Sequence, residues 1–315
     1  MNTGTIKNEG LMWGNLLHLG YNMWGESDCV KWDHYIEASP VLRFDKEIWD
    51  EILEQMVAAG MNTVVIDLGE GVRYESHPEI AVEGSWDVDY LRKELDKIRK
   101  MGLKPIPKLN FSAAHDEWLG EYSRCVSTKI YYQVCRDLIN EVIEIFDTPE
   151  LFHIGMDEET YLDQRFNTYA VVRNGDLWWH DLYFLVDLVE KKGVRAWVWA
   201  DYMWNHEEEY IRKMPKSVLQ SNWYYSSFLQ EKGKEEAKGI RAYRILEENG
   251  YDQVLTGSNW CRAYNFQETV DFGMKTIGKE RLKGFLQTPW VPTVKETKYR
   301  HFEAVDLVRQ AISKL

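Results

Sequence analysis

Apolar runs of strand length alternate with amphipathic segments of helical length along most of the chain. In the first such segment Ile48, Ile52 and Met56 recur at the spacing of one helix face, and Asp45 stands before them at the N-cap position. This periodicity predicts helices over residues 45–59, 86–101, 127–146, 179–192, 234–249, 266–277 and 298–314. The apolar runs predict strands over residues 11–19, 62–68, 103–110, 151–156, 195–200, 218–223, 253–258 and 284–288.

Strands that alternate with helices are typical of a parallel sheet, and eight such repeats close a (β/α)8 TIM barrel. The chain has no Pro-, Gly- or Ser-rich linker and no break in composition. Barrels of this kind commonly reach this length undivided, so we predict a single TIM-barrel catalytic domain over residues 1–315. Pro105 and Pro107 count against the third strand, because proline cannot donate to a sheet.

Composition and charge exclude several classes of protein. The formal net charge of −13 argues against nucleic acid as a partner, because phosphate binding needs clustered Lys and Arg. No apolar run approaches the ~20 residues needed to cross a bilayer, and residues 1–10 are polar without a signal-like apolar centre. We therefore expect a cytoplasmic protein that binds neither nucleic acid nor membrane, and a homo-oligomer is compatible with the sequence.

Cofactor and metal motifs are missing from the sequence pattern. Cys29, Cys125, Cys135 and Cys261 show neither the Cys-x-x-Cys spacing of a zinc site nor a dense disulfide framework. The predicted strand ends carry no Gly-rich phosphate loop, no Lys suited to a Schiff base and no His-x-His pair. We therefore expect reduced thiols, no metal and no cofactor.

The apolar run over residues 151–156 ends abruptly in three carboxylates, Asp157, Glu158 and Glu159. In a TIM barrel the residues just past each strand line the active site at one mouth of the barrel. An acidic cluster after a strand also caps the following helix, which is its ordinary structural explanation. The other strand ends that would face the same mouth are residues 15–22, 67–70, 110–115, 201, 222–223, 259–264 and 290.

These strand ends supply carboxylates, amides, histidine and aromatic rings. The chain holds 14 Trp and 18 Tyr, which is more than one core of this size needs. Aromatic faces stack on sugars, although Trp is also ordinary core filler. Paired carboxyl groups suit the hydrolysis of a glycosidic bond, because one protonates the leaving oxygen and the second stabilises the oxocarbenium-like centre. We therefore predict a glycoside hydrolase with a carbohydrate substrate.

The segment His153-Ile-Gly-Met-Asp157-Glu158 resembles the His-x-Gly-Gly-Asp-Glu signature of the family 20 β-N-acetylhexosaminidases. Arg43 resembles the sugar-binding arginine of that family, and the segment from Pro107 to His115 resembles its Pro-Glu-x-Asp-x-Pro-Gly-His motif. The likeness spans most of the predicted barrel, and only the segment around Asp157 is specific to the family.

The resemblance implies an exo-acting retaining enzyme in which the 2-acetamido oxygen of the substrate attacks the anomeric carbon. Glu158 would be the general acid, Asp157 would orient the acetamido group, and His115 would tune Glu158. Tyr264 would hold the acetamido oxygen. Burial among Trp side chains beside Asp157 should raise the pKa of Glu158. We expect the sugar pocket to be lined by Arg43, Trp199, Asp201, Trp223, Tyr264 and Trp290.

The sequence departs from the family pattern. Met156 replaces the second glycine of the signature, and Lys108 and Asn110 replace two acidic residues of the preceding motif. Pro292 stands where a carboxylate is expected two residues past Trp290. The resemblance assigns the carboxylate missing at position 292 to recognition of the outer sugar hydroxyls, so these departures leave the substrate open.

Two other functions therefore stay open. A glycosidase acting on 2-hydroxy sugars would pair Glu158 with Asp201 or Glu70. A non-catalytic sugar-binding barrel would keep the Trp pocket but leave Glu158 without supporting groups. The single residues also have ordinary structural explanations: the Trp side chains would be core, Arg43 would pair with a nearby carboxylate, and His115 would be a loop histidine.

Overall fold

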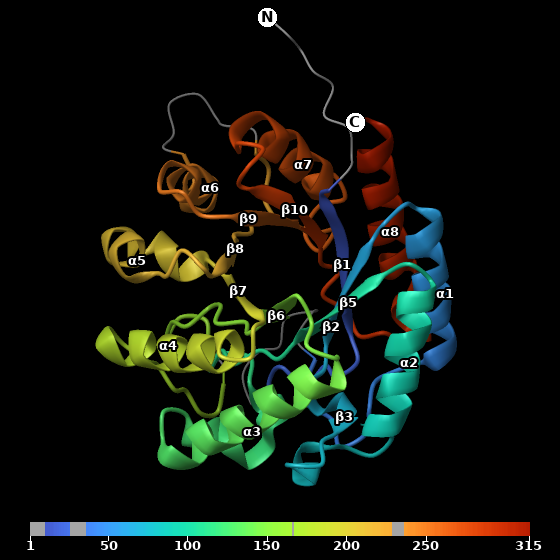
Figure 1. Cartoon of the computed structure of the whole chain (residues 1–315), viewed down its shortest axis with the longest axis vertical. Helices are drawn as coiled ribbons and strands as arrows, with labels where there is room; N and C mark the ends of the chain where they lie inside the picture. Colours follow the sequence, from blue (N-terminus) through green and yellow to red (C-terminus); the bar gives the residue numbers. More distant parts are fainter. Residues whose placement is uncertain (1–9, 26–35, 166, 229–235) are drawn as a thin grey trace, which may run out of the picture.

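The computed structural model describes residues 10–25, 36–165, 167–228 and 236–315. Cys29 and the start of the helix predicted over residues 234–249 lie outside the described residues. Eight parallel strands form a closed barrel that helices surround, as Figure 1 shows. The prediction of a (β/α)8 TIM barrel is therefore confirmed.

The barrel strands follow one another around the barrel in chain order, and the last pairs with the first. This is the arrangement that successive right-handed βα units produce. The strands are β1 (Met12–His18), β2 (Thr63–Asp67), β5 (Lys104–Lys108), β6 (Leu151–His153), β7 (Arg195–Trp199), β8 (Leu219–Ser221), β9 (Gln253–Gly257) and β10 (Leu282–Gln287).

The outer layer consists of α1 (Lys46–Ala58), α2 (Val88–Lys100), α3 (Lys129–Ile145), α4 (Asp176–Glu190), α5 (Glu207–Lys213), α6 (Lys238–Glu248), α7 (Asn265–Thr276) and α8 (Lys298–Ser313). The sequence pattern did not predict α5, because its seven residues are too few to show a helical period. It also did not predict the small sheet of β3 (Val72–Arg73) and β4 (Trp86–Asp87), whose strands are two residues long.

Helix starts follow from local side-chain chemistry. The Asp45 carboxylate accepts hydrogen bonds from the backbone N–H groups of Glu47 and Ile48 at 2.9 and 3.3 Å, which confirms it as the N-cap of α1. Asp87 caps α2 and Thr128 caps α3 in the same way. These caps satisfy backbone donors that no helical carbonyl can reach, so the boundaries are readable from sequence.

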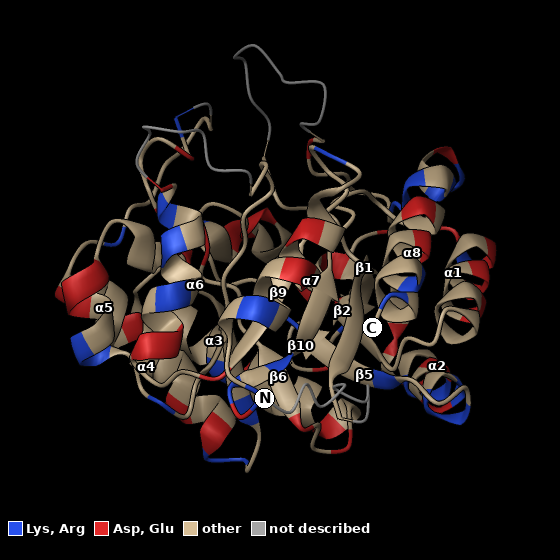
Figure 2. Ribbon diagram, turned by 90° about the horizontal axis from the view of Figure 1, so that it is seen from above, with Lys and Arg blue, Asp and Glu red and all other residues tan. Residues whose placement is uncertain are grey.

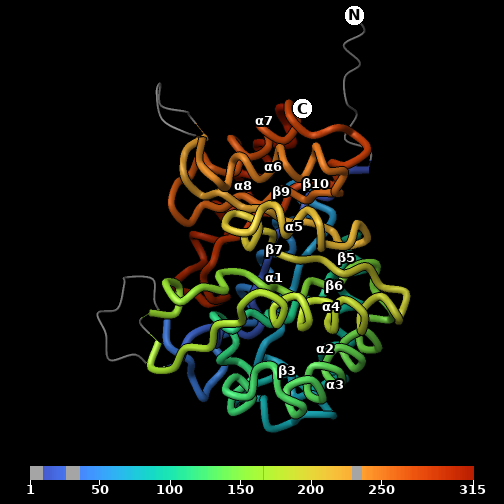
Figure 3. The backbone as a smooth tube through the Cα atoms, turned by 90° about the vertical axis from the view of Figure 1, so that its left-hand side faces the viewer, coloured from blue at the N-terminus to red at the C-terminus, as the bar shows by residue number. Residues whose placement is uncertain are grey.

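Two apolar layers hold the barrel together. The larger layer packs the helices onto the outside of the sheet, and α8 packs against α1 to close the ring. Figure 3 shows α6, α7 and α8 at one end of the molecule and α2 and α3 at the other, as sequential winding requires. A separate cluster fills the barrel interior, including Leu16, Val65, Ile106, Trp197 and Trp199.

Figure 2 shows acidic and basic positions interspersed along the outer helices. Within the described ranges every helix is too short or too polar to span a membrane. Cys125, Cys135 and Cys261 are free thiols, as predicted for these three.

Candidate active site

The backbone leaves the β region directly after β6, and there it presents the paired acids. Gly155, Met156 and Glu158 have φ angles of 74°, 74° and 53°, in the left-handed region that favours glycine. A Cβ at position 155 would lie 1.8 Å from Oδ1 of Asn110, so only glycine fits there. Met156 holds the same backbone conformation with a fully buried side chain. The predicted strand over residues 151–156 is shorter than expected for this reason, because β6 ends at His153.

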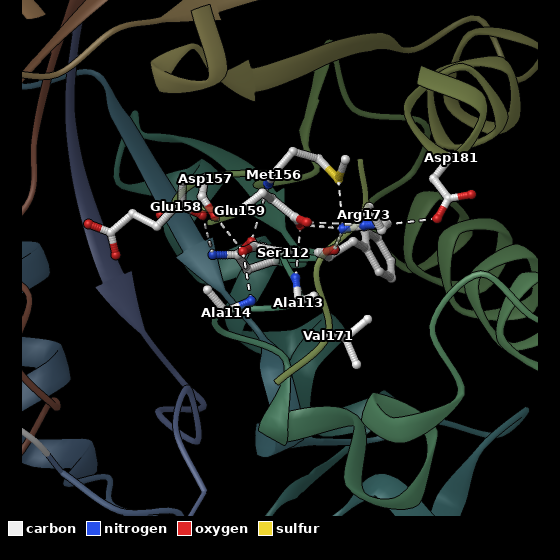
Figure 4. A network of polar contacts seen from close by, with 12 residues as sticks. Ser112, Ala113, Ala114, Met156, Asp157, Glu158, Glu159, Val171, Arg173 and Asp181 are labelled. Carbon is white, nitrogen blue, oxygen red and sulfur yellow. Dashed lines mark hydrogen bonds and ion pairs between the residues drawn. The ribbon is translucent and has the colours of Figure 1, made fainter. Parts of the chain in front are cut away.

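His115, Asp157 and Glu158 meet at this point. Nε2 of His115 lies 3.0 Å from Oε2 of Glu158 and 3.5 Å from Oδ2 of Asp157. His115 comes from the loop between β5 and α3, so two separate loops build the group. The side chains of His115 and Asp157 are buried, whereas that of Glu158 keeps 37% of its surface exposed. In Figure 4 the Glu158 side chain points away from Glu159.

Asn110 and Ser112 hold Asp157 in place. The side-chain Nδ2 of Asn110 donates a hydrogen bond to Oδ1 of Asp157 at 2.9 Å, and the Ser112 hydroxyl donates to the Asp157 carbonyl. Oδ1 of Asn110 accepts from the backbone N–H groups of Ser112 and Met156 at 3.0 and 3.3 Å. The amide of Asn110 therefore orients Asp157 by donating a hydrogen bond to it. An ionised acid at position 110 could not donate such a bond.

Asp201 lies at the same site and supports the backbone of Glu158. It begins the 3₁₀ turn that follows β7, and its Oδ2 accepts from the Glu158 N–H at 2.8 Å. Its Oδ1 accepts from the indole N–H of Trp223 at 3.2 Å. Burial, aided by the nearby charge of Asp157, raises the pKa of Asp201 well above its ordinary value.

The three central groups shift one another's protonation. Burial opposes the charge on His115, but Asp157 and Glu158 outweigh it and raise the pKa of His115 to about 9. Burial also opposes the charge on Glu158, yet its hydrogen bond with His115 holds the pKa of Glu158 below its ordinary value. Burial raises the pKa of Asp157, and His115 counteracts it. The expectation of a raised Glu158 pKa is wrong, because a cation contacts this carboxylate.

Aromatic side chains from several strand ends converge near these acids. The indole N–H of Trp290 donates to the Tyr225 hydroxyl at 2.9 Å, and its carbonyl accepts from the Tyr21 hydroxyl at 2.8 Å. The ring of Trp223 stacks on that of Tyr225 at 5.0 Å, and the ring centres of Trp199 and Trp290 lie 6.0 Å apart. Trp199 is only 1% exposed, so it supports the aromatic wall from inside the barrel.

Tyr264 does not take part in this group. Its side chain is 74% exposed at the N-cap of α7, which contradicts the expectation that it lies in the pocket. Tyr225 joins the aromatic group instead, because its hydroxyl contacts Trp290 and Thr288. Burial raises the pKa of Tyr225, and the charges of Asp157 and Glu158 add to that shift, which places the phenol within their electrostatic reach. Its sequence signal was its position two residues beyond Trp223.

Arg43 and Glu70 have different surroundings. Nη1 of Arg43 is buried without a hydrogen-bond partner, so this predicted sugar-binding side chain keeps donors for a ligand. The Glu70 carboxylate accepts from the backbone N–H groups of Tyr21 and Asn22 at 2.8 and 3.1 Å. Burial raises the pKa of Glu70 to about 7. Its bonds tie it to the loop after β1, so it is not a free partner for Glu158.

Lys108 occupies the barrel interior and does not face a ligand. Its side chain is fully buried and forms an ion pair with Asp67, whose carboxylate also lies 3.4 Å from Nδ1 of His18. Burial opposes the charge on Asp67, but Lys108 and His18 outweigh it and lower the pKa of Asp67 to about 2. The lysine that replaces the family's acidic residue is thus neutralised by a carboxylate from the neighbouring strand.

One group of the described residues also has metal-ligand geometry. A ring nitrogen of His115 and carboxylate oxygens of Asp157 and Glu158 lie within 4.8 Å of one another. The hydrogen bond between His115 and Glu158 already uses two of these atoms. The expectation that the protein needs no metal stays a prediction.

A second buried network adjoins the acids and was not predicted. Glu159, the third acid of the run, is 6% exposed and pairs with Arg173, which also pairs with Asp181 on α4. The only sequence signal was the third consecutive carboxylate. Arg173 lies in a segment without hydrophobic period, so nothing in the sequence pattern set it apart.

No protein-family model and no curated protein matches the sequence, but solved structures share the fold. A family 20 chitobiase from Flavobacterium johnsoniae matches with a TM-score of 0.58 at 15% identity, over 86% of this chain and 48% of that chain. Dispersin B matches with a TM-score of 0.56 at 15% identity, over 95% of this chain and 98% of that chain. A family 138 glycoside hydrolase that targets pectin rhamnogalacturonan II matches with a TM-score of 0.61 at 12% identity, over 96% and 48%.

The chain spans about half the length of the chitobiase and of the family 138 enzyme. Its barrel thus has the fold of the family 20 β-N-acetylhexosaminidases at low sequence identity. The same fold also occurs in the family 138 enzyme, so the fold by itself does not select a substrate.

Proposed function

We propose that the chain is a glycoside hydrolase that removes a terminal N-acetylhexosamine with retention at the anomeric carbon. The observation that carries this proposal is the contact group of His115, Asp157 and Glu158, in which Asn110 orients Asp157. Residues 1–315 would act as one catalytic domain on a carbohydrate substrate. The solved structures of family 20 enzymes support the class through the fold.

In the proposed reaction the 2-acetamido oxygen of the substrate attacks the anomeric carbon while the bond to the leaving oxygen breaks. Glu158 gives its proton to that oxygen and becomes a carboxylate. Asp157 holds the acetamido N–H and stabilises the positive charge of the oxazolinium ring. The Glu158 carboxylate then takes a proton from water as the water opens the ring, which restores the acid and retains the configuration.

The protonation states of His115 and Glu158 in the free protein determine how the first step receives its proton. His115 holds a proton, since its pKa is about 9, and Glu158 is ionised. A sugar that covers the exposed part of Glu158 removes water from its carboxylate, which raises the pKa of this group. The proton that Glu158 needs is then available along the 3.0 Å hydrogen bond from His115.

The sugar ring would lie against Trp290 and Trp223, both of which are partly exposed. The Tyr225 hydroxyl takes the place that Tyr264 was expected to hold, as the donor to the acetamido oxygen. Arg43 would donate to the outer hydroxyls with its unpaired Nη1. Trp290 and Trp223 provide rings for stacking on the sugar, and the other two side chains provide polar contacts. Sugar sites commonly combine these two kinds of contact.

The proposal is tested with nitrophenyl glycosides that differ only at C2 of the sugar. We expect hydrolysis of the β-N-acetylglucosaminide or β-N-acetylgalactosaminide and none of the matching β-glucoside or β-galactoside. Glu54→Gln, on the exposed face of α1, is a control for preparation effects. Hydrolysis of the 2-hydroxy sugars alone would contradict the substrate-assisted mechanism, and binding without hydrolysis would contradict the enzymatic role.

A glycosidase on 2-hydroxy sugars is the second candidate. The pKa of Asp201 is raised and that of Glu158 is lowered, and such a divergence suits an acid paired with a second carboxylate. The fold match with the family 138 enzyme shows that this architecture accommodates other substrates. Asp201 favours the first candidate, because both its oxygens are engaged by Glu158 N–H and the Trp223 indole.

A further inference from the structure

Arg173 is a buried cation beside the catalytic acids. Its side chain is 1% exposed and bonds to two carboxylates, Glu159 and Asp181, whose side chains are also 1% exposed. Nε of Arg173 donates to Glu159 at 3.1 Å, Nη2 donates to the same carboxylate, and Nη1 donates to Asp181 at 3.1 Å. Figure 4 shows the guanidinium between the two acids. We call Glu159, Arg173 and Asp181 the Arg173 clamp.

The Arg173 clamp joins the two loops that carry the proposed catalytic residues. Nη2 of Arg173 donates to the Phe111 carbonyl at 2.8 Å, and Oε1 of Glu159 accepts from the Ala113 N–H at 2.9 Å. Both of these partners lie in the loop that leads to His115. Glu159 follows Glu158 directly, so the same clamp holds the other side of the 3.0 Å contact between His115 and Glu158.

The clamp is anchored on the helical layer. Asp181 lies on α4, and it accepts hydrogen bonds from the hydroxyls of Ser127 and Tyr132 at 2.6 and 2.5 Å. Tyr132 lies on α3. Sites built on rigid elements hold their geometry better than sites on loops alone, so this anchor transmits the stiffness of two helices to the catalytic loops.

The clamp also lies against strained backbone. Met156 and Glu158 have positive φ angles, and Sδ of Met156 lies 3.6 Å from Nη2 of Arg173. Non-glycine residues in this region cost free energy and persist where surrounding contacts over-determine them. Arg173 and Glu159 supply such contacts on both sides of Asp157.

A contribution to the stability of the fold is a weak explanation for a buried ion network of this kind. Burying an ion pair costs desolvation energy that the mutual attraction only partly offsets, and apolar replacements of buried ion networks are often neutral or stabilising. A planar guanidinium does offer donors in several fixed directions, and here they reach Glu159, Asp181 and Phe111 at once. This geometry favours a role in orientation.

We propose that the Arg173 clamp is a positioning device, which holds the loop of His115 against the loop of Asp157 and Glu158. The proposal rests on the proposed glycosidase function for its effect on turnover. The charged groups that act on His115 are Asp157, Glu158, Lys108 and Asp163, and the ring of Trp24 lies 5.7 Å away. None of these groups belongs to the clamp. The clamp therefore acts on His115 by setting the distance between its imidazole and these groups.

The first test is kinetic and uses Arg173→Lys and Glu159→Gln. Lysine keeps the charge but cannot donate in three fixed directions, so the loops should lose their register. Because small misplacements at a reacting centre can cost about 100-fold, we expect kcat to fall by about that factor with KM changed little. Arg195→Lys is the matched control: Arg195 pairs with Asp252 at 2.9 Å at the start of β7, away from the strand ends of the site.

The second test does not need turnover. The imidazole resonances of His115 report its titration by NMR, and the midpoint should move down from about 9 in Arg173→Lys, because the carboxylates recede. A merely structural role would not move this midpoint in a folded variant. If the substrate screen fails but the midpoint still moves, the clamp stands without the proposed reaction.

Two further variants keep the proposal open to refutation if Arg173→Lys does not fold. Asp181→Asn keeps the Arg173–Glu159 pair and weakens only the anchor, so it should give a smaller fall in kcat and a smaller shift of the His115 midpoint. Met156→Gly relieves the strain, so a second substitution of Arg173 in that background should cost less. Folded clamp variants with unchanged kcat and an unchanged His115 midpoint would overturn the proposal.

Discussion

Nε2 of His115 lies 3.0 Å from Oε2 of Glu158, where two loops from neighbouring strands meet. The charge of Asp157 together with this contact raises the pKa of His115, and the contact lowers the pKa of Glu158, so the proton rests on His115 in the free protein. In the proposed reaction the general acid Glu158 therefore receives its proton from His115 when the substrate binds. Most of the predictions below depend on this proton.

Glu158→Gln should separate substrates by their leaving groups. Departure of a poor leaving group needs a proton, so its kcat should fall by about 10²- to 10⁴-fold. Activated aryl glycosides leave without a proton and should lose far less. Steady-state kinetics on both substrate types measure the difference, and equal losses on both would argue against the acid role.

Asp157→Asn should mainly lower kcat. The ionised carboxylate stabilises charge that appears only during the reaction, and removing such a group typically costs about 10²- to 10³-fold in kcat. KM should change little, since the ground-state contacts remain. A thiazoline mimic of the oxazolinium should inhibit the native protein tightly and the variant weakly. An equal affinity for both proteins would contradict this role.

Asp201→Asn separates the two candidate functions. Burial and the charge of Asp157 raise the pKa of the Asp201 carboxyl, which favours its neutral form. An isosteric neutral amide should therefore keep kcat within about threefold if Asp201 only supports the Glu158 backbone. A loss of roughly 10²-fold or more, as expected for a removed general acid, would favour the glycosidase on 2-hydroxy sugars. Side-by-side kcat values on one substrate decide the question.

The His115 pair should make stability depend on pH. The folded-state pKa of about 9 lies above the ordinary 6.5, so the stabilisation is complete below pH 6.5 and is lost as the pH rises through 9. This difference corresponds to about 3 kcal/mol. Urea unfolding at pH 6.5 and pH 9.5 should show that much extra loss in the native protein relative to His115→Gln. A parallel decline of both proteins would refute the pairing.

Tyr225→Phe and Tyr264→Phe form a matched pair of variants. The partly buried Tyr225 hydroxyl accepts a hydrogen bond from the indole N–H of Trp290, whereas Tyr264 is 74% exposed. Loss of one hydrogen bond to the acetamido group should lower kcat/KM by about tenfold in Tyr225→Phe. Tyr264→Phe should leave it unchanged. The reverse order of effects would restore Tyr264 as the pocket tyrosine.

Local patterns in the sequence were enough for the barrel and for the acids at its mouth. Asp45 caps α1 through bonds within its own turn, and apolar periodicity reflects burial one element at a time. Pro105 and Pro107 lie in β5, which pairs with its neighbours despite them. The position of Asp157 and Glu158 past a buried strand followed from the fold class, since all eight strands end at one mouth.

Only the tertiary structure decided which side chains meet those acids. Tyr225 contacts Trp290, whereas Tyr264 is exposed at the N-cap of α7, although both residues follow a strand. Arg173 is distant in sequence from Phe111 and Ala113 and has no periodic neighbours. Its contacts arise only when the barrel closes.

The electrostatics of the site also depend on the closed barrel. From the sequence, Glu158 was expected among Trp side chains with a raised pKa, and the structure places the His115 cation on its carboxylate instead. Distances of 3 to 4 Å set such shifts, and a motif specifies residue types without these distances. The sequence therefore determined the chemistry available at the barrel mouth, while the packing of two loops determined which group holds the proton.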